Sequence, residues 1–311
     1  MQRVRSALIG ALACLVALPG CTGGRGGTQP STYVPSRFPH PARVAVMVLE
    51  NRSYGQVIGS RDAPYLNRLA RRHALATNYF AITHPSLPNY IALTTGATAE
   101  VSTNCAACAT DLPSLVNQLD AASISWKAYF ESIPRDADIR VTPAAPYDKH
   151  YNPFVYTESV DGRRIDRSRV VDFRRLRRDL RHGHLPRFSW IAPNVHHDGH
   201  EHRLRAADAY AARTVPRVLH ALGPDGVLYL TWDEGRRSDR TGLDGSLGGG
   251  HVALIAAGGA ARRHTRTGIP ANHYALLRTV EANFGLPPLA SAGASSTPLL
   301  TGLLRGSNGP S

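Results

Sequence analysis

The sequence has almost no lysine: only Lys127 and Lys149 occur in 311 residues, so nearly all of the positive charge is arginine. The formal net charge is +13, which favours acidic partners such as phosphates, anionic lipids or nucleic acid. A basic balance can equally serve only solubility. Nothing but the charge points to nucleic acid, so we expect no nucleic-acid partner.

Other common patterns are also missing. No G-x-S-x-G motif occurs, which disfavours a serine hydrolase of the α/β-hydrolase type. No G-x-x-x-x-G-K-[ST] motif occurs, so a P-loop nucleotide site is not expected. After the first 21 residues, no segment is long and apolar enough to span a membrane. The remaining chain is long enough for one large domain with a substantial core.

The first 21 residues have the pattern of an export signal. Arg3 and Arg5 precede an apolar stretch over residues 7–18, which is too short for a good membrane span. The stretch ends in Leu-Pro-Gly followed by Cys21, which resembles a bacterial lipoprotein signal. We therefore expect an exported protein attached to a membrane through lipidated Cys21. Release by simple cleavage is the alternative, because Pro19 is unusual at its position.

The rest of the chain divides by composition. Residues 22–40 are rich in Gly, Pro, Ser and Thr and read as a flexible tether. One domain is expected over 41–290, and 291–311 reads as a loose tail. Within the domain, Cys105 and Cys108 are the only cysteines. We interpret them as a local disulfide, since an exported protein permits one. A redox pair or half of a zinc site are the alternatives.

Strand-like and helix-like segments alternate through the domain. Near-continuous apolar strands separated by helices indicate an α/β fold with a mainly parallel sheet covered on both faces. The expected strands are 43–49, 77–82, 125–130, 187–193, 226–232 and 251–259. The expected helices are 63–75, a segment after Ser86, 114–122, 169–183, 206–222 and 273–286. The basic helix 169–183 is more typical of a solvated face than of a binding groove.

Polar residues follow several of these strands. In a parallel sheet, ligands sit beyond the carboxyl ends of the strands. The residues placed there are Glu50, Asn51, His84, Ser86, the segment 193–202, Asp233, Glu234 and His251. Each has an ordinary explanation: a strand-end acid or Ser86 can cap a helix, and "HHDGHEH" can be a surface tract. Their coincidence at several strand ends favours one open site for a hard or borderline cation.

Ser86 lies between two prolines directly before a helix-like pattern, in "THPSLPNYIALTTG". A serine there can be a stiff turn residue, or a nucleophile at a helix N-terminus, where backbone N–H groups favour an anion. A metal ion beside it would lower the pKa of the hydroxyl and steady a phosphoryl oxygen.

With these motifs, the chain resembles the bacterial phosphoesterase family that joins secreted acid phosphatases with phosphatidylcholine-type phospholipases C, within the alkaline phosphatase superfamily. The motifs appear in order: "VLENRSY", "THPSLPNYIALTTG", "IAPNVHHDGHE", "LTWDEG" and "GGGHVALIAAGG". The match covers about Val44 to Leu289. It implies a three-layer α/β/α sandwich of the alkaline-phosphatase type. The short domain is more similar to the small secreted acid phosphatases than to the large phospholipases.

The resemblance also implies roles for individual residues. Ser86 would be the nucleophile and Asn89 would hold a phosphoryl oxygen. One divalent metal ion, with two as the alternative, would be bound by Glu50, Asn51, Ser86, Asp233 and Glu234. We assign His200 and His251 to catalysis, and His84, His197 and Asp198 to substrate binding. The resemblance does not say which of four residues would contact phosphate, which would donate a proton and which would bind metal. These residues are His197, Asp198, His200 and His251.

The expected function is an exported, metal-dependent acid phosphatase that hydrolyses phosphomonoesters through a phosphoserine on Ser86. A phospholipase C or phosphodiesterase acting on phospholipid head groups is the alternative among enzymes. A catalytically dead lipoprotein that binds phosphate or metal is the alternative from another class. The complete set of motifs disfavours that last reading, because a binding protein has no need of Ser86.

Overall fold

The computed structural model describes residues 38–134, 146–157, 168–200 and 203–306. The expected signal peptide, Cys21 and most of the expected tether fall outside these residues. Within the described ranges, none of the helices combines the length and apolar character needed to cross a bilayer.

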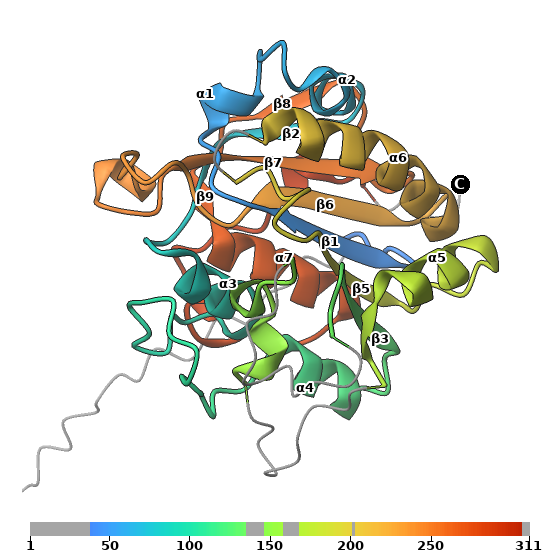
Figure 1. The fold of residues 1–311 in the computed structure, drawn as a ribbon, viewed down its shortest axis with the longest axis horizontal. Coiled ribbons are helices and arrows are strands. Elements are labelled where there is room, and N and C mark those ends of the chain that lie inside the picture. Colours follow the sequence, from blue (N-terminus) through green and yellow to red (C-terminus); the bar gives the residue numbers. More distant parts are fainter. Residues whose placement is uncertain (1–37, 135–145, 158–167, 201–202, 307–311) are drawn as a thin grey trace, which may run out of the picture.

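The described residues form one nine-stranded sheet at the centre of the molecule (Figure 1). The strand order is β4-β3-β5-β1-β6-β7-β2-β8, with β9 also paired to β2. The strands are β1 (Val44–Leu49), β2 (Ala74–Phe80), β3 (Trp126–Phe130), β4 (Val170–Asp172), β5 (Phe188–Ala192), β6 (Val227–Trp232), β7 (His251–Gly258), β8 (Thr265–Thr267) and β9 (Ala271–Asn272).

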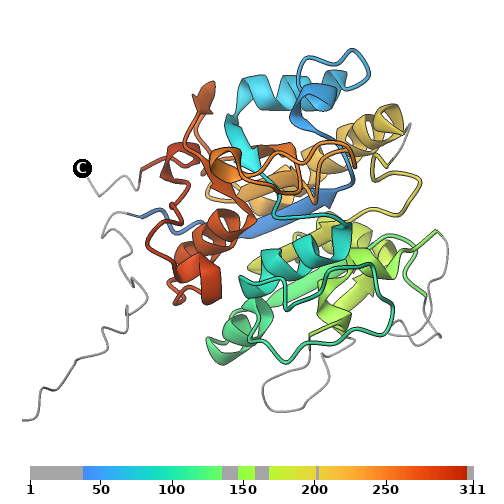
Figure 2. The same cartoon turned by 90° about the vertical axis from the view of Figure 1, so that its left-hand side faces the viewer.

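Helices cover both faces of this sheet, which makes the three-layer sandwich expected from the sequence (Figure 1). Helices α2, α5 and α6 lie on one face, and α3, α4 and α7 lie on the other, as Figure 2 also shows. The helices are α1 (Tyr54–Val57), α2 (Pro64–Arg72), α3 (Ser86–Thr95), α4 (Leu115–Ala121), α5 (Phe173–Arg181), α6 (Leu204–Leu222) and α7 (His273–Phe284). Short 3₁₀ turns are η1 (Lys149–Tyr151), η2 (Pro153–Val155), η3 (Leu243–Gly245), η4 (Ala290–Gly293) and η5 (Thr301–Leu303).

Burial on both faces explains the apolar character of the central strands. Every residue of β1, β5 and β6 is buried. These three strands run parallel and are neighbours. Near-continuous apolar runs are the sequence signature of such strands, which is why these elements could be predicted.

One long strand runs the other way. Strand β7 pairs antiparallel with both β6 and β2. The start of β7 therefore lies at the edge where the parallel strands end, and His251 reaches that edge although it opens its strand. The loop before β7 also packs tightly there: a Cβ on Gly249 would collide with the carbonyl oxygen of Thr83.

The element boundaries differ most from the prediction at two places. Helix α2 ends at Arg72, and β2 already begins at Ala74, where it pairs with β7 and β8. The first residues of the predicted helix 169–183 form the edge strand β4 instead. Asp172 ends that strand, and its carboxylate accepts hydrogen bonds from the backbone N–H groups of Arg174 and Arg175, which starts α5.

The segment 291–306 differs from the loose tail predicted from Ser291. Leu300, Leu303 and Leu304 are buried, and Leu304 forms a bridge with Ala261. Arg278 Nη1 donates to two backbone carbonyl oxygens in the segment, at 2.8 and 2.5 Å. The composition predicts an irregular tail because small and polar residues dominate it. A few buried leucines nevertheless anchor the segment to the domain. At the other end, Phe38 is also buried, although the tether was expected to reach residue 40.

Glu281 on α7 gives the fold a pH dependence. Its Oε1 accepts a hydrogen bond from Leu289 N, while its buried Oε2 has no partner among the described residues. Burial raises the pKa of Glu281 to about 9, against about 4.3 in an unfolded chain. The folded state therefore holds a proton that the unfolded chain loses. The resulting stabilisation is complete below the unfolded pKa and is lost as the pH rises toward the folded pKa.

We expect Glu281→Gln to stabilise the protein at pH 8 by on the order of 1–3 kcal/mol, and to change stability little at pH 4.5. The neutral amide retains an acceptor for Leu289 N and removes the cost of ionising a buried carboxyl. Urea unfolding at the two pH values measures the difference. An equal change at both pH values would contradict the assignment.

Candidate active site

Two adjacent strands place the central acids side by side. Leu49 and Trp232 are paired partners at the ends of β1 and β6. Glu50 and Asp233 follow directly, so both acids lie at the same edge. The backbone N–H of Asn51 donates to Asp233 Oδ1 at 3.0 Å, and Asp233 N donates to Leu49 O at 2.9 Å. Asn51 has a left-handed φ of 53°, which asparagine tolerates better than most residues.

Ser86 joins these acids from the first turn of α3. Its Oγ donates to Glu50 Oε2 at 3.2 Å, and Ser86 is only 5% exposed. The Asn51 side chain completes the group. In the orientation that satisfies both of its polar atoms, its nitrogen donates to Glu50 Oε2 (3.2 Å) and Glu234 Oε1 (3.3 Å). Its oxygen then accepts from His200 Nε2 at 3.0 Å.

The three acids are almost completely buried: Glu50 is 1%, Asp233 is 0% and Glu234 is 4% exposed. Burial raises the pKa of each carboxyl. Repulsion from Asp233 and Asp198 raises the pKa of Glu50 further, and Glu234 does the same to Asp233. Three carboxyls buried next to one another cannot all ionise unless a positive charge lies beside them.

The donor set fits a divalent cation in its chemistry. Asp233 Oδ2 is buried and has no hydrogen-bond partner in the described part of the chain. Carboxylate, amide and hydroxyl oxygens are the ligands that hard cations prefer. Within the described ranges, no three or more His, Cys, Asp or Glu side chains are arranged as a group that could hold a metal ion. The fit therefore rests on the unpaired Asp233 oxygen and the uncompensated charge.

His84 reaches the site from the turn before α3. Its Nδ1 lies 3.0 Å from Glu234 Oε2, and its Nε2 lies 2.8 Å from the backbone oxygen of Asp239. Burial alone would lower the pKa of His84, but the Glu234 carboxylate and the hydrogen bond to the Asp239 carbonyl together outweigh burial and raise it. His84 is therefore a positively charged neighbour of Glu234 when protonated.

Asp198 and His200 also lie beside the acids. The backbone oxygen of Asp198 accepts from Glu50 N at 2.9 Å, and Asp198 Oδ1 accepts from His200 N at 2.7 Å. Burial raises the pKa of Asp198. These contacts bring both predicted residues to the acids. Among the described histidines of segment 193–202, His200 faces Asn51.

Asn89 has a different place from the one predicted. It is completely buried, and its amide makes four hydrogen bonds within the turn that precedes α3. Its oxygen accepts from Ile82 N and Thr83 N, and its nitrogen donates to Thr83 O and Pro85 O. An amide has no further capacity. Asn89 therefore braces the Ser86 turn and has no atom left for a phosphoryl oxygen.

His197 and His251 lie apart from the acids. His197 Nδ1 is 2.9 Å from Glu131 Oε2, and its ring stacks on Tyr210. His251 Nε2 is 3.0 Å from Thr77 O, and its ring lies parallel to Tyr54 with the centroids 4.5 Å apart. Burial lowers the pKa of His251. Neither ring contacts Ser86 or the three acids in the described structure, which does not favour the roles predicted for them.

Sequence reasoning missed several residues that support the site. Tyr90 donates its hydroxyl to Glu50 Oε1 at 2.5 Å, and Tyr151 donates to Asp198 Oδ2 at 2.8 Å. His273 Nε2 lies 2.6 Å from Asp233 O. Asp239 accepts from Ser53 Oγ at 2.6 Å and holds His84 through its carbonyl. All these contacts join distant parts of the chain. Only Tyr90 carried a signal, because it lies one turn after Ser86.

Comparison with known proteins shows the family of the chain. The sequence pattern of the phosphoesterase family matches residues 56–287, which is most of the chain. The chain belongs to the phosphoesterase family. As a phosphoesterase it is a hydrolase that acts on phosphoric ester bonds, as its relatives with phosphatase names are.

Two relatives illustrate the range of the phosphoesterase family. A phosphatidylinositol-3-phosphatase of Mycobacterium tuberculosis is 30% identical over 254 residues, covering 81% of this chain and 80% of that protein. A phosphate-repressible acid phosphatase of Penicillium chrysogenum is 29% identical over 234 residues, covering 72% of this chain but only 55% of the fungal protein. The chain thus spans about half of the fungal relative.

Solved structures show the fold. A protein of the alkaline phosphatase superfamily from Vibrio parahaemolyticus superposes with a TM-score of 0.57 at 14% identity, covering 87% of this chain and 72% of that one. A phosphonate monoester hydrolase from Silicibacter pomeroyi superposes with a TM-score of 0.52 at 12% identity, covering 86% and 78%. The α/β/α fold is therefore that of the alkaline phosphatase superfamily, as the sequence predicted.

Proposed function

We propose that the chain is a phosphomonoesterase of the acid phosphatase type that works through a phosphoserine on Ser86. The observation that carries the proposal is the Ser86 hydroxyl, which donates to the buried carboxylate of Glu50 at the first turn of a helix. The names of the relatives support monoester hydrolysis, since they include acid phosphatases and a phosphatidylinositol-3-phosphatase.

In the proposed first step, Ser86 Oγ attacks phosphorus while the bond from phosphorus to the alcohol oxygen breaks. The proton of the hydroxyl passes to Glu50 Oε2, its hydrogen-bond acceptor. The N-terminal end of α3 stabilises the phosphoryl oxygens through the helix dipole, which favours anions there. We assign the donation of a proton to the departing alcohol oxygen to His200, whose Nε2 faces Asn51.

In the second step, water attacks the phosphoserine, and the bond from phosphorus to Ser86 Oγ breaks to release inorganic phosphate. Glu50 returns its proton to Ser86 Oγ as this bond breaks, which restores the serine hydroxyl. The histidine that gave its proton takes one from the attacking water. Catalysis then consists mainly of positioning and charge stabilisation.

The proposed holder of a divalent metal ion is the set Glu50, Asn51, Ser86, Asp233 and Glu234. When bound, such an ion would neutralise the buried carboxylates and polarise a phosphoryl oxygen. We propose one ion. A second would need further acidic or histidine ligands, and His197 and His251 face other partners.

Export and membrane attachment belong to the same proposal. The expected signal over residues 1–21 and the lipidation of Cys21 would place the enzyme outside the cytoplasm. Labelling cells with a fatty acid that carries a chemical tag tests this: wild type should take up the label, and Cys21→Ser should not.

A pair of ester substrates tests the activity itself. We expect p-nitrophenyl phosphate to be hydrolysed and bis-p-nitrophenyl phosphate to be hydrolysed at least about 100-fold more slowly. A chelator should abolish turnover of the monoester, and divalent metal ions should restore it. Hydrolysis of the diester alone would replace the proposal by a phosphodiesterase or phospholipase C. If folded, metal-loaded protein turns over neither ester, the result would favour a catalytically dead lipoprotein that binds phosphate or metal.

A further inference from the structure

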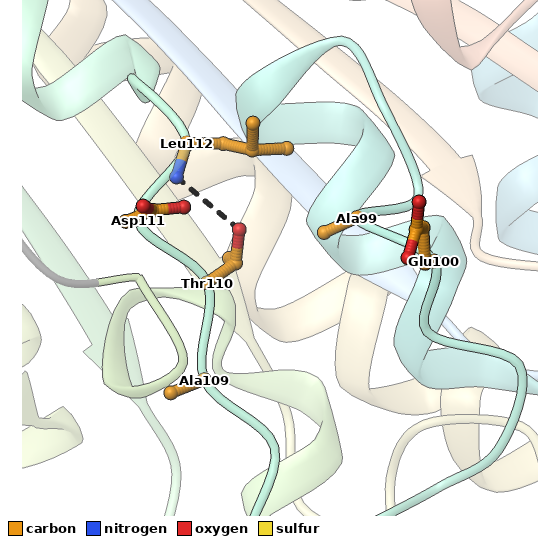
Figure 3. A pocket seen from close by; sticks show the side chains of 6 residues that line it. All are labelled: Ala99, Glu100, Ala109, Thr110, Asp111 and Leu112. Carbon is orange, nitrogen blue, oxygen red and sulfur yellow. Dashed lines mark hydrogen bonds between the residues drawn. The ribbon is translucent and has the colours of Figure 1, made fainter.

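The segment between α3 and α4 folds back on itself around a cavity (Figure 3). The cavity has a volume of about 500 Å³ and is lined by Ala99, Glu100 and residues 109–112. The returning limb is anchored by Thr110 N, which donates to Tyr156 O at 2.8 Å, and by Leu112 N, which donates to Thr110 Oγ1 at 3.2 Å. The cavity lies between the two limbs at this point, and the tip of the segment is held by contacts of its own.

The tip is the loop Asn104–Cys108, which we call the disulfide loop. Cys105 and Cys108 are joined in a disulfide. Both cysteines pack against a small apolar cluster of Leu87, Ile91 and Tyr156, two of which belong to α3. The ammonium group of Lys149 donates to the backbone oxygen of Ala106. The loop is thereby fixed against the helix that carries Ser86.

One hydrogen bond links the disulfide loop directly to the start of α3. Asn104 Oδ1 accepts from the backbone N–H of Leu87 at 2.9 Å. Leu87 follows Ser86, and the first N–H groups of a helix have no partner within the helix. The N-cap residue is Pro85, whose side chain supplies no cap. Asn104 therefore supplies, from another part of the chain, the cap that α3 lacks.

We propose that the disulfide loop is a positioning element for Ser86. The disulfide holds Asn104 against Leu87, and this cap fixes the first turn of α3 and the direction of the Ser86 side chain. The proposal rests on Ser86 being the nucleophile. Asn104 and the two cysteines are positioning residues, because they act through the helix. A displacement of about 1 Å at a reacting group can cost about 100-fold in rate.

Four forms of the full chain test the proposal: wild type, Asn104→Ala, Cys105→Ser with Cys108→Ser, and all three changes together. We expect each altered form to lose hydrogen-exchange protection at the Leu87 amide and to lower kcat by about 10- to 100-fold, with KM changed less than about threefold. The effects should not add in the combined form, because all the changes break one connection. Amide exchange measures the cap without depending on activity.

Two further variants sharpen the test. Asn104→Asp keeps an acceptor for Leu87 N, so both protection and kcat should return, while the added charge raises KM for an anionic substrate. Asn117→Ala is the matched control: Asn117 Oδ1 accepts from Ser114 N at the start of α4, which carries no predicted site residue. It should lower Tm by about 2–4 °C and leave kcat unchanged.

Three results would overturn the proposal. The first is unchanged exchange at Leu87 in all altered forms. The second is lost protection with unchanged kcat. The third is an Asn104→Asp protein that protects Leu87 but remains as slow as Asn104→Ala, because Asn104 would then act on the substrate directly. Failure of the proposed function looks different: Ser86→Ala would retain full activity.

Discussion

Ser86→Ala is expected to lower kcat for p-nitrophenyl phosphate by at least about 1,000-fold while the protein stays folded. The change removes the atom that forms the covalent bond to phosphorus in the proposed mechanism. The fold should survive, because alanine suits the first turn of a helix and the hydroxyl gives up one hydrogen bond, to Glu50. Steady-state kinetics together with thermal unfolding separates loss of chemistry from loss of structure.

Ser189→Ala is a matched control for this substitution. Ser189 on β5 is also buried, and its hydroxyl has no hydrogen-bond partner among the described residues. Its removal deletes the same atom from the interior and should leave kcat unchanged. Acid quenching of wild type during turnover should also trap a phosphoryl group on the peptide that contains Ser86. A Ser86→Ala enzyme with wild-type kcat would remove Ser86 from the mechanism.

Asp233→Asn should act in opposite directions on metal binding and on the stability of the metal-free protein. Loss of a carboxylate from the proposed ligand set should reduce bound metal, measured by elemental analysis, by at least about 10-fold and reduce kcat by about 100-fold or more. Without metal, the variant should unfold at a higher temperature than wild type, because repulsion among Glu50, Asp233 and Glu234 is relieved.

Thermal unfolding with and without a chelator shows both effects. A ligand at 100 times its Kd stabilises the folded state by about 2.7 kcal/mol, so wild type should lose stability in chelator and the variant should not. Asp208→Asn is the control. Asp208 is also buried and caps α2 through Leu66 N and Tyr65 N, so the change should lower Tm and leave metal content unchanged. Equal metal content in Asp233→Asn and wild type would contradict the proposed ligand set.

The acids of the site could be predicted because two local signals coincide. Glu50 and Asp233 each follow a run of buried apolar residues, and such runs are central parallel strands whose ends share an edge. Ser86 could be predicted because a serine between prolines before a helix-like pattern marks a helix start. Strand ends and helix starts depend on residues that are close together in the sequence, so they can be predicted from a single sequence.

The direction in which a side chain points cannot be predicted from such local patterns. His197 and His251 were placed at the correct edge, but their rings turn toward Glu131 and Tyr54. The side-chain amide of Asn89 uses all of its hydrogen bonds within the turn before α3. Partners such as Tyr151 and Asp239 come from segments without periodic patterns. Those contacts follow from tertiary packing, which composition and periodicity do not encode.

The reversed direction of β7 has a consequence for engineering this enzyme. The connection from β6 to β7 leaves and returns at the catalytic edge, and close packing fixes it at Gly249, where no side chain fits beside Thr83. Two residues earlier, Leu247 is 85% exposed. Segments grafted between Leu243 and Leu247 would therefore sit at the rim of the site on a rigid base.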